Sequence, residues 1–286
     1  MVSSHIEFLK GVSRQLLYPL YSLIIDRLAR IKYSKILTEK YDKVSIGQRG
    51  NHFMARHSAV NRIRSIEGKN ILVIGCGAGD DISSWLSFKP KSVIAIDYMD
   101  YEKEWSKKLI EFSKTYRTSV SFFQADAINL SMINSESIDF VCSDAVFQHL
   151  QNYAAVLKEL TRVLKPKGIM YAAMGPLYHS YSGDMVSGSD EIGNGYNHIL
   201  LDSDSYVSYF NSTFDSRDPR TFYFEHKMFS FLKSDEYINE VERLGYSRLY
   251  LACILSKKGL IFRKNHQEKF NEKDLLLETL SFIYEK

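Results

Sequence analysis

The sequence is poor in cysteine and has none of the spacings by which cysteine and histidine bind structural zinc. Its three cysteines, Cys76, Cys142 and Cys253, stand in apolar, strand-like contexts among the 286 residues. An odd number of such residues argues against a disulfide framework and favours a reducing compartment, so we expect a cytoplasmic protein. No CxxC pair is present, and no recognised carboxylate spacing points to another metal. We therefore predict that no metal is required.

The N-terminal region lacks a signal-peptide pattern and a membrane-spanning run. Its longest apolar stretch, residues 16–25, is too short to cross a bilayer and contains Pro19. Residues 1–70 hold 13 Lys and Arg against 5 Asp and Glu, which leaves 24 against 29 for the rest of the chain. We predict a basic helical segment over residues 1–66, followed by one domain over residues 67–286. Such a segment can contact a membrane surface or nucleic acid peripherally, although a solvated helical face is the more common use.

From residue 70 onward, apolar strand patterns alternate with helical ones. The strand patterns are near-continuous apolar runs, which is typical of a parallel sheet covered by helices on both faces. Alternating units of this length predict an open α/β domain whose parallel strands end at one edge. The predicted strands cover residues 71–75, 92–97, 119–126, 137–144 and 169–175, and the predicted helices cover residues 81–88, 101–116 and 153–165.

The pattern changes after the fifth predicted strand. Residues 176–232 are rich in Tyr, Ser, Gly, Asp and Asn without a clear period, and a long irregular excursion of this kind is usually functional. We predict a substrate-side insert or lid there. The remaining pattern predicts a helix over 234–246, two strands over 247–255 and 259–264 joined by a turn, and a final helix over 272–286.

The first strand runs into the glycines Gly75, Gly77 and Gly79, and Asp80 follows at once. Glycine reaches positive φ and lets a ligand approach the backbone at the start of the next helix. A dinucleotide fingerprint would need a third glycine at position 80, so the aspartate there disfavours a diphosphate. Asp97 ends the second strand, where a carboxylate can accept the hydroxyl groups of a ribose. Each feature alone fits an ordinary turn, but their occurrence at successive strand ends predicts a nucleoside-binding site.

Five segments follow one another at regular spacing between residues 73 and 174. They are "VIGCGAG" (73–79), "VIAID" (93–97), "QADA" (124–127), "IDFVCSDAVFQHL" (138–150) and "VLKPKGIMYAAM" (163–174). Together they resemble the class I S-adenosylmethionine-dependent methyltransferases. The resemblance covers about residues 71–176 in one continuous order, and residues 234–263 look like the end of that fold. It implies an open seven-stranded, mostly parallel Rossmann-like sheet with helices on both faces, and S-adenosylmethionine as cofactor.

The resemblance also implies roles for individual residues. The three glycines and Cys76 would lie under the methionine part of the cofactor. Asp97 would bind the ribose hydroxyls, with Tyr98 beside it, and Ser143 would lie near the cofactor on the fourth strand. Asp126 and Ala127 would recognise adenine. Family members usually carry an acidic residue two positions before the first glycine, where this chain has Val73. Asp80 or a residue of the basic segment is a candidate to replace that acid.

The acceptor of the methyl group is less well marked. A hydroxyl acceptor needs a base in reach, whereas a carboxylate acceptor needs none. We take His179, just past the fifth strand, and His149, after the fourth, as candidate catalytic bases. Tyr178, Asp184, Glu191 and His198 are candidates to form an acceptor pocket with His179 or to be a polar surface loop. His57 has little context and is interpreted as structural.

We predict methyl transfer to a small-molecule or glycan-like acceptor, with oxygen as the favoured atom. The Asn/Asp-Pro-Pro-Tyr/Phe motif for transfer to amide or base nitrogen is missing after the fourth strand, where "SDAVFQ" stands, so a nucleic-acid acceptor is disfavoured. The alternatives left open are an RNA or membrane-lipid methyltransferase guided by the basic segment, and a non-catalytic module that binds the cofactor. The sequence does not indicate an oligomeric state.

Overall fold

The computed structural model describes residues 24, 27, 28, 32, 33, 37, 39–47, 52–215, 228–262 and 270–286. Most of the predicted basic segment before residue 39, and residues 216–227 of the predicted insert, lie outside the described residues. None of the helices within the described ranges is long and apolar enough to span a membrane.

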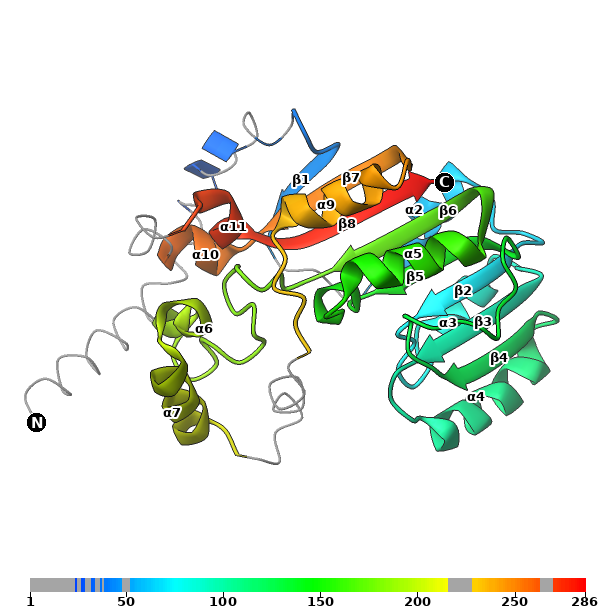
Figure 1. The fold of residues 1–286 in the computed structure, drawn as a ribbon, viewed down its shortest axis with the longest axis horizontal. Helices are drawn as coiled ribbons and strands as arrows, with labels where there is room; N and C mark the ends of the chain where they lie inside the picture. Colours follow the sequence, from blue (N-terminus) through cyan, green and yellow to red (C-terminus); the bar gives the residue numbers. More distant parts are fainter. Residues whose placement is uncertain are drawn as a thin grey trace, which may run out of the picture. The chain divides into compact units, whose positions relative to one another are not determined.

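The strands form one open sheet in the order β1-β7-β8-β6-β5-β2-β3-β4 (Figure 1). Neighbouring strands from β6 to β4 are parallel, as predicted, so the α/β Rossmann-like class is confirmed. The sheet has eight strands instead of seven because a short strand, β1, pairs in parallel with β7 at the edge of the sheet. The bounds are β1 Lys43–Ile46, β2 Asn70–Ile74, β3 Ser92–Asp97, β4 Ser119–Gln124, β5 Ile138–Asp144, β6 Leu164–Met174, β7 Ser247–Leu255 and β8 Leu277–Glu285.

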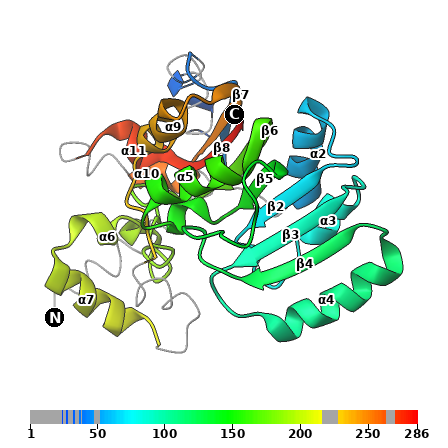
Figure 2. The same cartoon turned by 45° about the vertical axis from the view of Figure 1, so that its right-hand side comes forward.

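Helices follow the strands of the central part of the chain. Figures 1 and 2 both show α5 lying over β5 and β6, and α4 beside β4. The helix α5 begins after Asn152, whose side chain accepts a hydrogen bond from the Ala155 N–H, and it ends at Val163, directly before β6. The bounds are α2 Phe53–Ile63, α3 Ile82–Leu86, α4 Glu102–Thr115, η1 Phe147–His149, α5 Tyr153–Val163 and α9 Ser234–Arg243.

The chain divides into two compact units. One consists of residues 50–174, 237–251 and 281–286, and the other of residues 1–49, 175–236 and 252–280; we call them the cofactor unit and the insert unit.

In the cofactor unit, both faces of β2 are buried. Ile71 and Val73 belong to a core cluster with Trp85 of α3, while Leu72 and Ile74 on the opposite face are at most 2% exposed. Burial on both faces explains why the strand is a continuous apolar run.

The insert unit contains short elements around a smaller apolar cluster of Tyr181, Tyr196, Phe262 and Leu275. The Asp202 side chain accepts a hydrogen bond from the Ser205 N–H at 3.0 Å and begins α7. The bounds are η2 Ile192–Asn194, α6 Asn197–Leu200, α7 Ser203–Thr213, α10 Lys257–Phe262 and α11 Glu272–Leu276.

Two predictions at the C-terminal end are wrong. The strand predicted over 259–264 is replaced by α10 as far as Phe262, and its last two positions lie outside the described residues. The final helix predicted over 272–286 is the short helix α11 followed by the strand β8. The predicted terminal hairpin therefore does not form, because the partner of β7 is β8. The backbone pairs of Lys167 with Lys286 and of Leu177 with Glu278 show that β8 runs antiparallel to β6 (Figure 1). The buried residues Thr279, Phe282, Ile283 and Tyr284 are β-branched or aromatic, types that favour strands.

Candidate functional site

The turn after β2 depends on glycine at three positions. The φ angle is 70° at Gly75, 50° at Gly77 and 86° at Gly79, in the region that glycine adopts without strain. A Cβ atom on Gly75 would lie 2.1 Å from Cγ2 of Val146, so a side chain does not fit there. At Gly77, no described atom beyond the residue itself and its two chain neighbours lies within 4 Å of the position that Cβ would take. The backbone at Gly77 is therefore open to a ligand on that side.

Asp97 lies beside this turn, at the end of the neighbouring strand β3. Its Oδ2 accepts the Gly77 N–H at 2.7 Å, and its Oδ1 accepts the Met99 N–H at 2.9 Å. The indole Nε1 of Trp105 donates to the Gly77 carbonyl at 2.8 Å and fixes the same turn from α4. A carboxylate offers about four lone-pair sites, so two remain for a ligand. The geometry presents an oriented carboxylate next to an open glycine backbone.

The other predicted cofactor-binding residues differ in exposure. Tyr98 is 60% exposed after β3. Asp126 is exposed after β4 and accepts a backbone N–H two residues further on, while Ala127 is buried. Cys76 is buried, and this burial raises the pKa of its thiol. The buried Ser143 hydroxyl donates to a carbonyl of β2 at 3.2 Å, so it joins two strands.

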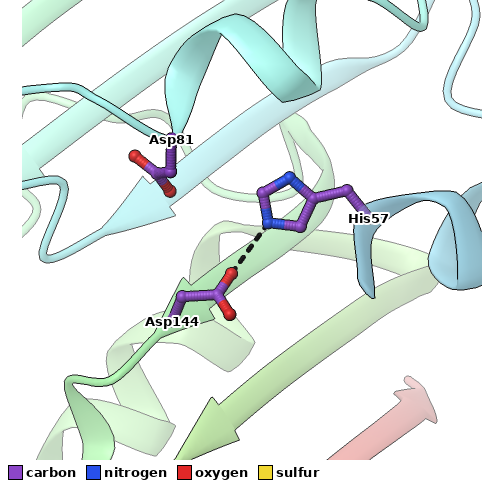
Figure 3. A group of neighbouring side chains, drawn as sticks. All are labelled: His57, Asp81 and Asp144. Atoms are coloured by element: carbon purple, nitrogen blue, oxygen red, sulfur yellow. Dashed lines mark hydrogen bonds and ion pairs between the residues drawn. The ribbon is translucent and has the colours of Figure 1, made fainter. Parts of the chain in front are cut away.

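A buried polar cluster that the sequence analysis missed lies at the ends of β2 and β5. Figure 3 shows His57 on α2, Asp81 directly before α3 and Asp144 at the end of β5. One ligand-capable atom of each residue lies within 4.8 Å of the other two, so the group is also a candidate to hold a metal ion. Asp144 accepts hydrogen bonds from His57 Nε2 at 2.8 Å, from Arg56 Nε at 2.8 Å and from the Tyr171 hydroxyl at 3.0 Å.

His57 is held in place on three sides. Its Nδ1 forms a hydrogen bond with the Ser84 hydroxyl, its Nε2 faces Asp144, and its ring stacks on Trp85 with centroids 3.5 Å apart. The structural interpretation of His57 therefore fits its packing, but the side chain also orients a buried carboxylate. Asp144 lies 87 positions away along the chain, so no local pattern relates the two residues.

The two carboxylates of the cluster differ in their pKa values. The hydrogen bond from His57 and the charge of Arg56 outweigh burial and hold the pKa of Asp144 below its usual value. Burial, together with the nearby charge of Asp144, raises the pKa of Asp81 to about 7. Burial lowers the pKa of His57, which favours its neutral form. Near neutral pH, Asp144 is thus charged and well partnered, while Asp81 is close to its midpoint.

Comparisons with known proteins agree on the family. The profile of the methyltransferase-domain family matches residues 72–172. A sterol 24-C-methyltransferase of Aspergillus fumigatus is 23% identical over 172 residues, which cover 58% of this chain and 44% of that enzyme. A malonyl-[acyl-carrier protein] O-methyltransferase of Halalkalibacterium halodurans is 21% identical and aligns over 76% of this chain and 81% of its own. A crystal structure of an S-adenosylmethionine-dependent methyltransferase from Mesorhizobium loti superposes with a TM-score of 0.51 at 14% identity, covering 82% of this chain and 98% of that one.

Residues 72–172 of this chain thus match a methyltransferase domain, and its fold is that of the class I S-adenosylmethionine-dependent methyltransferases. S-adenosylmethionine is accordingly its cofactor. This methyltransferase spans less than half the length of the sterol enzyme that it matches.

The residues of the site fit this cofactor. The open backbone at Gly77 and the Asp97 carboxylate suit a nucleoside with a free ribose diol. The acidic residue usual two positions before the first glycine is absent, since Val73 is 1% exposed and part of the apolar core. Asp80, which was a candidate to replace that acid, is exposed and forms an ion pair with Lys108 at 3.2 Å.

In the insert unit of the methyltransferase, three of the four residues considered for the acceptor pocket come together. His198 Nε2 lies 2.6 Å from the Tyr178 carbonyl, and His198 Nδ1 lies 3.7 Å from Asp184 Oδ1. Burial lowers the pKa of His198 and favours its neutral form. Glu191 instead accepts a long hydrogen bond, 3.4 Å, from Asn194. Asp184 and His198 are buried, so they form a packed polar cluster.

The two candidate bases have different surroundings. His179, in the insert unit, has its Nε2 3.0 Å from the Phe231 carbonyl. The carbonyl oxygen can only accept a hydrogen bond, so Nε2 donates and the lone pair of the neutral ring lies on Nδ1. His149, in the cofactor unit, is 9% exposed, and its Nε2 lies 3.3 Å from the side-chain nitrogen of Gln148. The lone pair of His149 Nε2 is therefore already engaged.

Proposed function

We propose that this methyltransferase acts on a small-molecule acceptor and methylates it at oxygen. The open glycine turn at Gly77, with the Asp97 carboxylate bonded to its N–H, supports the cofactor site on which the proposal rests. The malonyl-[acyl-carrier protein] O-methyltransferase, which aligns over most of both chains, supports oxygen as the methylated atom. The sterol 24-C-methyltransferase favours carbon as the second candidate.

A cavity in the insert unit supports an acceptor of small size. Its volume is about 600 Å³, and pockets for drug-sized molecules measure about 300–1,000 Å³. Ile46, Pro176, Tyr181 and Met185 supply apolar wall, while two lysines and a glutamate supply charge. This lining suits an acceptor with an apolar body and a polar or acidic group. The charged residues are Lys257, Lys258 and Glu278.

The methyl group of the bound cofactor is already activated by the sulfonium sulfur. The protein therefore mainly has to hold the cofactor, align it with the acceptor and exclude water. We assign Gly75, Gly77, Asp97 and Asp126 to holding the cofactor. A carboxylate acceptor would need no further group. A hydroxyl acceptor would need its proton removed, and we assign this step to Nδ1 of His179, with His149 as the alternative.

Replacing Asp97 tests the cofactor site. Asp97→Ala removes a charged acceptor of ribose hydrogen bonds, and we expect affinity for S-adenosylhomocysteine to fall about 100-fold or more. Isothermal titration calorimetry measures the change. The matched control is Glu104→Ala, which removes an exposed carboxylate of the nearby helix α4 and should leave the affinity unchanged. Equal affinities of the wild type and Asp97→Ala would contradict the assigned site.

Replacing His179 distinguishes a hydroxyl acceptor from a carboxylate acceptor. Wild-type enzyme is first offered panels of hydroxyl and carboxylate compounds, and release of S-adenosylhomocysteine is followed. With a hydroxyl acceptor, His179→Ala should slow turnover by about 10²–10⁴-fold while cofactor affinity stays unchanged. With a carboxylate acceptor, the same variant should turn over normally. Normal turnover of a hydroxyl acceptor would show that His179 is not its base, and His149→Ala then tests the alternative.

A further inference from the structure

The two buried carboxylates of the cluster in Figure 3 differ in what surrounds them. Asp144 accepts three hydrogen bonds, from Arg56, His57 and Tyr171. Asp81 is only 8% exposed, yet no other residue in the described part of the chain donates a hydrogen bond to its side chain or forms an ion pair with it. A buried carboxylate without a partner is costly. A cation bound to the Asp81 carboxylate would offset this cost.

The cation that suits this position is an ammonium group. A metal ion would need several open ligand atoms, but both nitrogens of His57 and the carboxylate of Asp144 are already engaged within the cluster. An ammonium group carries only donors and needs only acceptors, which is what the Asp81 carboxylate offers. Asp144, lying within 4.8 Å of Asp81, adds a second negative charge that further favours a cation.

The position along the chain connects this acceptor with the cofactor. Asp81 follows Gly79 by two residues and directly precedes α3, so it closes the glycine turn. The cofactor has one ammonium group, on its methionine part. The acid that the family usually supplies from the position of Val73 is missing here, because that side chain lies in the apolar core.

We propose that Asp81 binds the α-ammonium group of S-adenosylmethionine, in place of the acidic residue absent at Val73, and that Arg56 and His57 hold Asp144 beside it. The proposal rests on the cofactor assignment. Asp81 is a binding residue in this role, whereas Arg56 and His57 are positioning residues that act through Asp144. The basic leading part of the chain thus contributes to the site through α2.

The test compares two ligands that differ only in the amino-acid part. S-adenosylhomocysteine carries the ammonium group, whereas 5′-methylthioadenosine has the same nucleoside and lacks it. Loss of one charged hydrogen bond should lower the affinity of Asp81→Asn for S-adenosylhomocysteine about 10- to 100-fold. Its affinity for 5′-methylthioadenosine should not change. Asp80→Asn, which replaces the adjacent exposed carboxylate, is the matched control and should bind both ligands like the wild type.

The pH dependence of calorimetric affinity supplies a second readout. Asp81 is flanked by Asp144, Asp80, Arg56 and His57, and its pKa is raised to about 7 by burial and by Asp144. Wild-type affinity for S-adenosylhomocysteine should therefore increase from pH 5.5 to pH 7.5. The increase should be absent with 5′-methylthioadenosine and in Asp81→Asn.

Three outcomes would overturn the proposal. Equal losses for both ligands in Asp81→Asn would make Asp81 a structural residue. Unchanged binding of both ligands, with Mn²⁺ titrating the wild type but not Asp81→Asn, would make the cluster a metal site. A wild-type protein that binds neither nucleoside would remove the cofactor assignment itself, together with the proposed function; the first two outcomes leave both standing.

Discussion

Two buried aspartates, one in each unit, show how the same side chain can serve different purposes. Asp184 of the insert unit is 2% exposed, and Asp81 of the cofactor unit is 8% exposed. Asp184 accepts the Ser187 N–H at 2.8 Å, the Ser187 hydroxyl at 2.7 Å and the Tyr206 hydroxyl at 2.5 Å. Asp81 accepts no hydrogen bond from any other described residue.

The difference separates a carboxylate that stabilises the fold from one that the fold tolerates. Hydrogen bonds to a buried carboxylate compensate for its lost hydration. Asp184 has such compensation, and Tyr206 stays protonated to supply it because burial and the Asp184 charge raise its pKa. Asp81 lacks compensation in the protein alone. Buried polar groups that the protein itself does not satisfy are therefore the better indicators of a ligand.

The largest effect on stability is expected at Asp184. Asp184→Ala removes the acceptor of the buried Ser187 hydroxyl and of the half-buried Tyr206 hydroxyl, and we expect the free energy of unfolding to fall by about 3–5 kcal/mol. Urea unfolding followed by circular dichroism measures the change.

The control for this prediction is Asp190→Ala. Asp190 accepts a hydrogen bond from Tyr209 at 2.8 Å, but the pair is exposed, so the loss should stay below about 1 kcal/mol. A small loss at Asp184, equal to that at Asp190, would break the distinction between the two buried aspartates.

Local patterns predict the fold of the cofactor unit well, because β2, β3 and β5 are largely buried and are followed by α3, α4 and α5. The runs at 71–75, 92–97 and 137–144 correspond closely to β2, β3 and β5. The carboxyl ends of neighbouring parallel strands lie side by side, so the positions of these runs alone predict that Gly77 and Asp97 are close together. The same reasoning finds the ribose side of the site from strand ends alone.

Local patterns fail where pairing partners are distant in the sequence. The β8 segment begins with leucines and ends with charges, which favours a helix, but its place between β7 and β6 makes it a strand. The strand β1 is only four residues long and gains its partner, β7, from two hundred positions further on. His57 and Asp144 likewise meet only in the folded chain, so sequence reasoning interpreted His57 by itself and did not consider Asp81 as a binding residue.

Asp81→Asn, in unfolding experiments without ligand, should change the free energy of unfolding less than Asp184→Ala does. It tests the difference between the two buried aspartates more sharply. The pKa of Asp81 is about 7 in the folded chain, compared with about 3.9 when unfolded. The folded state therefore binds more protons between these values, and the stability that protonation provides is present below pH 4 and lost as pH rises through 7. Asparagine does not titrate, so the variant escapes this loss and should exceed the wild type by as much as about 3 kcal/mol at pH 8.

The advantage of Asp81→Asn should shrink as the pH is lowered towards 4. The lowered pKa values of His57 and Asp144 affect both proteins, and their contributions largely cancel in the difference. Urea unfolding of the two proteins at pH 5, 6, 7 and 8 measures that difference directly. Saturating S-adenosylhomocysteine should reverse its sign at pH 8, because the ligand then supplies the partner that the wild-type carboxylate lacks. A variant that is less stable than the wild type at every pH would place Asp81 with Asp184, among the carboxylates on which the fold depends.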